Sequence, residues 1–175
     1  MATVRFTATG TDKHLKVTDK LNSAAKPEFG FQKVHAEKPF EVAFSTYDGA
    51  TGKVKIEVSR NGSDYGIHEP GMIVRHDEQP YTIDDSKLPA HVEFKATESD
   101  KYIKVTDNLD VSRKPKVKFQ KVSDPPFKVA VSAENGNGNV KVEVSKDDTD
   151  YELHDDDMQV THGGEYPIND ASLRK

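Results

Sequence analysis

The chain has 175 residues, of which 34% are hydrophobic and 31% charged, with a formal net charge of -5, no cysteine and no tryptophan. The missing thiols exclude disulfides, cysteine-ligated zinc, iron–sulfur clusters and thiol catalysis. The weakly acidic charge has the wrong sign for a surface that binds phosphate groups, so we expect no nucleic-acid partner.

The sequence predicts neither a membrane span nor a secretion signal. No stretch approaches the roughly 18 consecutive apolar residues of a membrane-spanning helix, which predicts no membrane span. The first residues, MATVRFTATGTDKH, contain no apolar segment of the secretory type. With the absence of cysteine, these features favour a cytoplasmic location and leave non-classical secretion open.

The sequence is one unit written twice. Laying residues 4–36 over residues 92–124 makes seventeen of 33 positions identical. The match continues with small length changes through PFEVAFS and PFKVAVS, GKVKIEVS and GNVKVEVS, and YTIDDSKL and YPINDASL. An ordered match of this length indicates internal duplication, so we expect one domain over 1–88 and a second over 91–175.

Apolar residues alternate with polar ones along short segments of each copy, which predicts half-buried β-strands. In chain order, the alternating residues of the first copy are Val4, Phe6 and Ala8; Leu15 and Val17; Phe29 and Phe31; Phe40, Val42 and Phe44; Val54, Ile56 and Val58; Met72, Val74 and His76. Turn sequences such as TGTDK and SRNGSDY separate them, and ENGNGN in the second copy predicts a tight hairpin.

No window carries an apolar stripe at helical spacing, so the sequence predicts an all-β fold. Seven or eight short strands in each copy, spaced by 8 to 13 residues, are typical of a sandwich. We therefore expect two tandem antiparallel β-sandwich domains of the Greek-key or immunoglobulin-like kind. Each core should be thin, because the chain contains little apolar material.

A set of acidic, aromatic and imidazole side chains recurs in both copies. Its members are Asp64, Tyr65, His68 and His76, and then Asp150, Tyr151, His154 and His162. We interpret each set as a strand-turn-strand unit in which His76 returns beside His68. The tyrosine ring would then stack on a sugar while the acid and imidazoles bind hydroxyl groups. The same residues also fit a purely stabilising role, with an inward tyrosine and histidines at the sheet edges.

An acidic run distinguishes the second copy. It comprises Asp147, Asp148, Asp150, Glu152, Asp155, Asp156 and Asp157. Calcium takes six to eight oxygen ligands, so Asp155, Asp156 and Asp157 are the predicted metal ligands and calcium is the one cofactor that the sequence suggests. The spacing of a calcium-binding helix-loop-helix is missing, and a solvated acidic face is the alternative.

The sequence contains no motif of a catalytic site, such as GxSxG, HExxH or a phosphate-binding glycine loop. We therefore predict a protein that is not an enzyme and that binds through two similar modules, with a lectin-like preference for glycans. A protein surface, including another copy of the chain in a homo-oligomer, is the second class of partner. The alternative function is a cytoplasmic structural or stress-associated protein that binds calcium.

Overall fold

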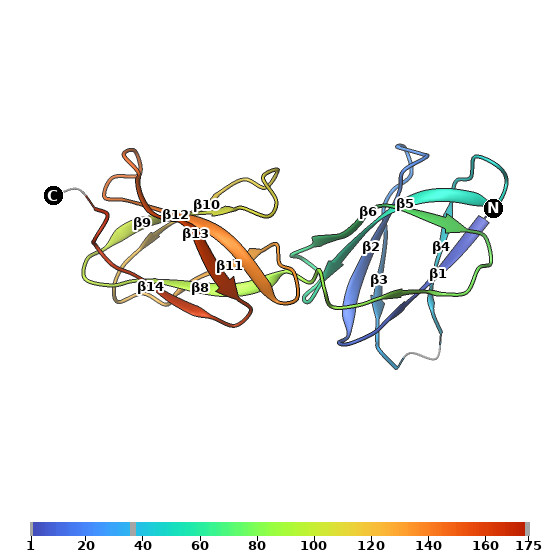
Figure 1. Ribbon diagram of the computed structural model, residues 1–175, viewed down its shortest axis with the longest axis horizontal. Coiled ribbons are helices and arrows are strands. Elements are labelled where there is room, and N and C mark those ends of the chain that lie inside the picture. The colour runs from blue at the N-terminus through green and yellow to red at the C-terminus, as the bar shows by residue number, and fades with distance from the viewer. Residues whose placement is uncertain (1, 36–37, 174–175) are drawn as a thin grey trace. The chain divides into compact units, whose positions relative to one another are not determined.

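The computed structural model describes residues 2–35 and 38–173 of the chain. The chain divides into two compact units, residues 1–88 and residues 89–175, which we call the first and second modules (Figure 1). Every regular element in the described residues is a β-strand, which confirms the all-β class. Those residues accordingly include no helix long and apolar enough to cross a bilayer.

The first module is a sandwich of two sheets. Its strands are β1 (Ala2–Ala8), β2 (Lys13–Asp19), β3 (Glu28–Gln32), β4 (Phe40–Phe44), β5 (Thr51–Ser59), β6 (Gly66–Arg75) and β7 (Tyr81–Ile83). One sheet has the order β4-β1-β7 and the other the order β3-β2-β5-β6. The chain therefore changes sheets after β1, β3, β4 and β6, as expected for a sandwich rather than a simple meander.

The second module repeats this arrangement. Its strands are β8 (Ala90–Ala96), β9 (Lys101–Asp107), β10 (Lys116–Gln120), β11 (Phe127–Val131), β12 (Asn137–Ser145), β13 (Glu152–Thr161) and β14 (Glu165–Ile168). The sheet orders are β11-β8-β14 and β10-β9-β12-β13. A tight turn with positive φ at Asn135 and Gly136 joins β11 to β12, and the bridge between Glu134 and Asn137 closes it.

One strand pair in each module runs parallel, which the prediction of antiparallel sheets did not include. β7 pairs with β1, and β14 pairs with β8, in the parallel sense. In both modules the last strand crosses over from the four-stranded sheet and joins the three-stranded sheet beside the first strand. All other strand pairs in the described residues are antiparallel.

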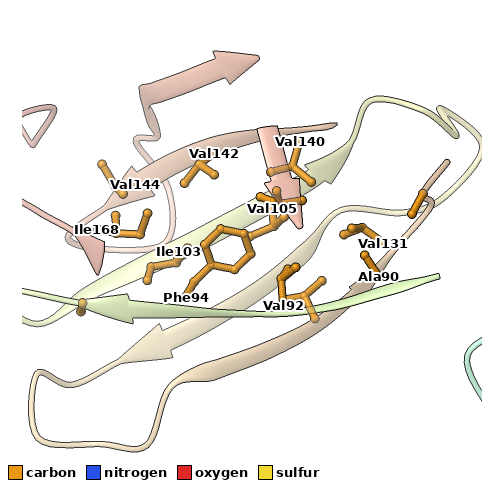
Figure 2. Packing of buried hydrophobic residues seen from close by; sticks show 14 residues of the cluster. Ala90, Val92, Phe94, Ile103, Val105, Val131, Val140, Val142, Val144 and Ile168 are labelled. Carbon is orange, nitrogen blue, oxygen red and sulfur yellow. The ribbon is translucent and has the colours of Figure 1, made fainter. Parts of the chain in front are cut away.

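Most of the alternating apolar residues form the two cores, as the sequence predicts. β1 and β8 both show strict alternation of buried and partly exposed positions, and Phe6 and Phe94 are completely buried at their centres. Figure 2 shows Phe94 projecting into the core among Val92, Ile103 and Val105. Each module thus encloses its own cluster of mainly aliphatic side chains, with Phe6 and Phe44 buried in the first module and Phe94 in the second.

A fully buried lysine at the start of the second strand of each module is a feature that alternation alone does not predict. The ammonium group of Lys13 donates to the carbonyl oxygens of Thr9 (2.5 Å) and Ile83 (3.0 Å) and pairs with Asp85 at 2.9 Å. Three acceptors satisfy the three protons of the ammonium, which offsets much of the free energy of burying the charge.

The second module contains the same contact. Lys101 is also fully buried, and it donates to the carbonyl oxygens of Thr97 (2.8 Å) and Ile168 (2.9 Å) and pairs with Asp170. In both modules the lysine ties the end of the first strand to the end of the last strand. We call this contact the lysine latch.

Candidate binding surfaces

The outward side of the four-stranded sheet carries a row of paired side chains in the first module. Strand register aligns Phe29 of β3, Lys16 of β2, Glu57 of β5 and Ile67 of β6 across the sheet. Leu15 and Val17 flank Lys16, and Ile56 and Val58 flank Glu57. These four residues are buried in the core, so the row that contains Lys16 and Glu57 points away from it. We call this side of each four-stranded sheet the outer face.

A charged group lies at the centre of the outer face of the first module. The carboxylate of Glu57 contacts the ammonium of Lys16 at 3.3 Å and that of Lys55 at 3.1 Å. Lys16 is also enclosed by two rings, with its Nζ 5.8 Å from the centroid of Phe29 and 5.6 Å from that of Tyr65. These ring-to-cation distances fall within the range of a cation–π interaction.

Aromatic rings remain exposed around that charged group. Phe29 and Tyr65 meet edge to face at 6.1 Å between centroids, and Phe31 lies against the ring of His14 at 4.7 Å. Phe29 is 59% exposed and Phe31 is 50% exposed, although the alternation of these two residues predicted core positions. The prediction is therefore wrong about these two residues, because their rings lie on the outer face of β3 and not on its core face.

The inward side of β3 explains this reversal. A Cβ atom at Gly30 would lie 2.5 Å from the ring of Phe40, so the ring of Phe40 occupies the space that a side chain of β3 would fill. The other inward position is Gln32, which is buried and donates from its side-chain amide to the carbonyl oxygen of Lys33. The two phenylalanines of β3 therefore face solvent.

The outer face of the second module has the same design with different rings. Glu143 contacts Lys104 at 3.7 Å and Lys141 at 3.3 Å, and Lys104 Nζ lies 5.0 Å from the centroid of Tyr151. Tyr102 packs against Phe119 at 5.0 Å between centroids. Exposed aliphatic side chains, Val117 and Leu153, take the places of Phe29 and Ile67.

The two predicted tyrosines belong to these outer faces, and both stay protonated at neutral pH. Burial and the nearby charge of Glu57 raise the pKa of Tyr65. Burial also raises the pKa of Tyr151, and a hydrogen bond to Asp148 adds to the shift. Each phenol therefore remains a hydrogen-bond donor beside a ring that is partly open to solvent.

The predicted acids beside these tyrosines stabilise turns. Asp64 accepts a hydrogen bond from the side-chain amide of Asn61 at 2.8 Å. Asp150 donates its backbone N–H to the carboxylate of Asp147 at 3.1 Å. Both acids lie in the turn between the third and fourth strands of the outer face, and neither completes a polar cluster with the histidines predicted to join it.

His68 and His154 occupy β-bulges. The register of β6 against β5 skips residue 68, and that of β13 against β12 skips residue 154. The Nδ1 atoms of His68 and His154 are buried without a hydrogen-bond partner in the described part of the chain. Burial lowers the pKa of both imidazoles, which favours the neutral form.

His76 and His162 lie at the far end of the same strands, so the expected return of His76 beside His68 is wrong. Residues Gly66–Arg75 form one continuous strand without an intervening turn. At about 3.3 Å per residue, the two histidines are on the order of 25 Å apart. The Nδ1 atom of His76 accepts from the N–H of Thr3, and that of His162 from the N–H of His91, both at 3.0 Å.

The acidic run spreads along a turn and a strand. Asp155 accepts a hydrogen bond from the N–H of Asp157 at 3.0 Å, while Asp157 accepts one from the side chain of Asn139. Within residues 2–35 and 38–173, no three carboxylate or imidazole side chains gather into a group that could hold a metal ion. Calcium binding at Asp155, Asp156 and Asp157 stays a prediction.

Sequence reasoning missed the central residues of the outer faces, Lys16, Glu57, Lys104 and Glu143. A usable signal was present, because both copies place Lys and Glu at matching positions between apolar residues of central strands. Opposite charges at neighbouring positions of adjacent strands are a common cross-strand pair. Finding them requires knowing which strands are adjacent, and β2 pairs with β5 rather than only with its sequence neighbour.

Comparisons with known proteins give little further information. No protein family matches the sequence, and no curated protein matches it either. Among solved structures, the chain is similar to the Bacillus anthracis TIE protein at 10% sequence identity, with a TM-score of 0.30. That match covers 95% of this chain and 33% of the TIE protein chain, so the chain spans about a third of that structure.

Proposed function

We propose that the chain is a non-enzymatic glycan-binding protein in which the outer face of each module is a binding surface. The observation that carries this proposal is the repeated grouping of aromatic rings around a lysine–glutamate–lysine group, with Phe29 and Phe31 exposed in the first module and Phe119 in the second. A ring offers an apolar surface to one side of a sugar, while phenol, carboxylate and ammonium groups bind its hydroxyls. Both kinds of contact are available side by side in each module.

Each site on its own is expected to be weak. The outer faces are open sheet surfaces, and the rings are tilted against their neighbours by 40°, 70° and 49° rather than lying in one plane. Two weak sites on one chain bind a repetitive ligand much more tightly than either alone when both engage. A surface that displays many copies of a glycan therefore suits this chain better than a free monosaccharide.

The test begins with the full chain on a glycan array, followed by calorimetry with the glycans that bind. Replacing Phe31 and Phe119 with alanine in the same chain should weaken the Kd by about tenfold or more, equivalent to about 1.4 kcal/mol. The matched control is Tyr47→Ala, because Tyr47 is also exposed but lies in the loop between β4 and β5 rather than on a strand of the four-stranded sheet. Binding that survives the double substitution, or no binding to any glycan, would contradict the proposal.

A protein surface is the second candidate ligand for the same faces. The observation that favours it is the presence of exposed aliphatic side chains, Ile67 in the first module and Val117 and Leu153 in the second, beside the rings. Aliphatic and aromatic anchors around a shielded charge pair are common at protein interfaces. Replacing Ile67 and Leu153 with serine separates the two candidates, because it should weaken a protein contact and leave ring stacking on a sugar largely intact.

A further inference from the structure

The two edges of the four-stranded sheet in the second module carry opposite charges. The order β10-β9-β12-β13 places β10 and β13 at opposite edges of one sheet. Residues 113–121, RKPKVKFQK, contain β10 with five basic residues and no acidic one, and we call this segment the basic edge. Residues 147–157, DDTDYELHDDD, lead into β13 with seven acidic residues and no lysine or arginine, and we call this segment the acidic edge.

Most of the charge on the basic edge is available to a partner. Lys114, Lys116, Lys118 and Lys121 are exposed, and none of them pairs with a carboxylate in the described residues. Lys118 lies over the ring of Phe127 at 5.9 Å, which leaves its charge uncompensated. Arg113 differs, because it contacts the carboxylates of Asp107 and Asp110.

The acidic edge is equally open. Asp148, Asp150, Asp156 and Asp157 are exposed, and within residues 2–35 and 38–173 no lysine or arginine forms an ion pair with any of them. Among the described residues, the side chains of Asp150 and Asp156 also make no hydrogen bond, and only their backbone groups do. The module therefore keeps two segments of opposite charge apart.

The backbone of β10 adds a second reason to expect a partner. In the part of the chain that the structure describes, β10 pairs only with β9, so one side of the strand is open for hydrogen bonding. Its residues Val117 and Phe119 are 45% and 41% exposed. Lysines on an edge strand oppose pairing with a like edge, but they attract an acidic one. Two basic edges repel, and so do two acidic edges, whereas a basic edge and an acidic edge attract.

We propose that copies of this chain associate head to tail, with the basic edge of one second module against the acidic edge of another. The charge complementarity of the two edges identifies the occupant as a second copy of the chain. β13 contains two bulges, so side-chain ion pairs hold the contact rather than a continuous ladder of backbone hydrogen bonds. Such a heterologous contact leaves a free edge at each end and builds open chains or closed rings.

Sedimentation velocity of the full chain at increasing protein concentration tests this assembly. Association is expected at about 0.01 M salt, where charges act over about 30 Å, and monomers at about 1 M salt, where they act over about 3 Å. Wild-type chain that stays monomeric at every concentration in low salt would overturn the proposal. Association that is equally strong at both salt concentrations would overturn it too, because it would not be driven by the charged edges.

Charge reversal at each edge identifies the surfaces involved. Lys114→Glu with Lys116→Glu leaves the basic edge with three basic and two acidic residues, and Asp150→Lys with Asp156→Lys leaves the acidic edge with five acidic and two basic residues, so each variant alone should associate more weakly than the wild type. An equimolar mixture of the two should associate again through the basic edge of one variant and the acidic edge of the other, which are unchanged, whereas a single chain that carries all four substitutions should associate least. A mixture that stays monomeric while both variants keep the wild-type circular dichroism spectrum and Tm would contradict the proposed contact.

The first module supplies the matched control. Lys26 and Lys33 flank β3 at the positions equivalent to Lys114 and Lys121, but Glu28 and Gly30 replace the lysines of β10. Lys26→Glu with Lys33→Glu changes the net charge as much as reversal of two lysines at the basic edge. Association should persist in this variant, and its loss would show that net charge rather than the edges of the second module drives assembly.

Discussion

The two modules agree in their interiors and differ at the edges of their four-stranded sheets. Both completely bury a phenylalanine of the first strand, Phe6 or Phe94, and a lysine at the start of the second strand. At the edges, EFGFQ of β3 corresponds to KVKFQ of β10, and GIHEPGMIVR of β6 corresponds to ELHDDDMQVT of β13. Core positions must fill a fixed volume with apolar groups, whereas an edge strand needs only to remain soluble.

The comparison shows that the two modules are similar in their core residues and different in their edge strands. If the interiors are equivalent, substitutions at matching core positions should have matching effects on the free energy of unfolding. If the edges and turns are not equivalent, substitutions there should affect only one module. The following variants test the comparison on both sides.

The largest effect is expected at the central phenylalanines. Phe6→Ala and Phe94→Ala each remove a completely buried ring and leave a cavity, which should lower the free energy of unfolding of the affected module by about 3–5 kcal/mol. Urea unfolding of the full chain, followed by circular dichroism, measures both variants. Phe29→Ala is the control and should change stability little, because its ring is exposed. A large difference between the two core variants would show that the interiors are not equivalent.

The lysine latch should give the next largest effect, again in both modules. Lys13→Met or Lys101→Met keeps the side-chain length but leaves two carbonyl oxygens and a carboxylate without their partner. We expect the free energy of unfolding to fall by about 3 kcal/mol. This value is at the low end for a broken buried ion pair, because the side chain of Asp85 is 35% exposed. The control is Lys16→Met, whose surface pair with Glu57 should contribute less than about 1 kcal/mol. Equal losses of free energy of unfolding for Lys13→Met and Lys16→Met would show that the lysine latch contributes no more than a surface ion pair.

Alternation along the sequence was sufficient to predict most of the fold. The period of two in segments such as 54–58 and 140–144 identifies strands that pack one face on a core, and the repeat shows that the chain builds this core twice. Alternation does not identify which face is inward. Phe29 and Phe31 alternate like core residues, yet they point outward because Phe40 fills the space beside Gly30.

The candidate sites were harder to predict, because their contacts join strands that are distant in sequence. The sequence singles out Tyr65, but its neighbours Lys16 and Phe29 lie on strands that precede it by more than thirty residues. Lys13 looks like a solvent-exposed residue in sequence, and only the carbonyl of Ile83 and the carboxylate of Asp85, seventy residues later, make its burial favourable. Such contacts depend on strand order, which alternation does not encode.

The stability of one turn should depend on acid pH in the second module and not in the first. The carboxylate of Asp147 accepts the N–H groups of Thr149 (3.0 Å) and Asp150 (3.1 Å), while Asn61 makes the same two contacts in the first module with a side chain that does not titrate. Hydrogen bonds from those backbone groups lower the pKa of Asp147 below its ordinary value of 3.8. Its contribution to stability is therefore complete above pH 3.8 and is lost as the pH falls through the lower folded-state value.

Exchanging these two residues tests that difference. Asp147→Asn should reduce the fall in Tm between neutral pH and acid, and Asn61→Asp should increase it when it is combined with Asp64→Asn, so that the new carboxylate does not face that of Asp64. Differential scanning calorimetry of the full chain at a series of pH values measures both changes. The double exchange should restore the wild-type dependence on pH, with the acid-sensitive turn transferred to the first module. An unchanged pH profile in all three variants would mean that other carboxylates dominate acid unfolding.

The smallest effect concerns the turn after the first strand of each module. Gly10 has φ of 81° there, whereas the second module has Glu98 at φ of 71°, in a region that disfavours residues with a Cβ atom. Glu98 also accepts the N–H of Asp170 at 2.8 Å, which offsets part of the strain. Glu98→Gly should therefore stabilise the second module by less than about 1 kcal/mol.

Glu98→Ala separates the two contributions at this turn, because alanine removes the hydrogen bond to Asp170 and keeps the strained backbone. The Glu98→Ala variant should be less stable than both the wild type and the Glu98→Gly variant. The difference in free energy of unfolding between the alanine and glycine variants measures the backbone strain, at about 1 kcal/mol. If glycine is less stable than glutamate, the hydrogen bond outweighs the strain. In that case the side chain of Glu98 is a second contact, beside the lysine latch, that holds the turn after β8 against the residues following β14.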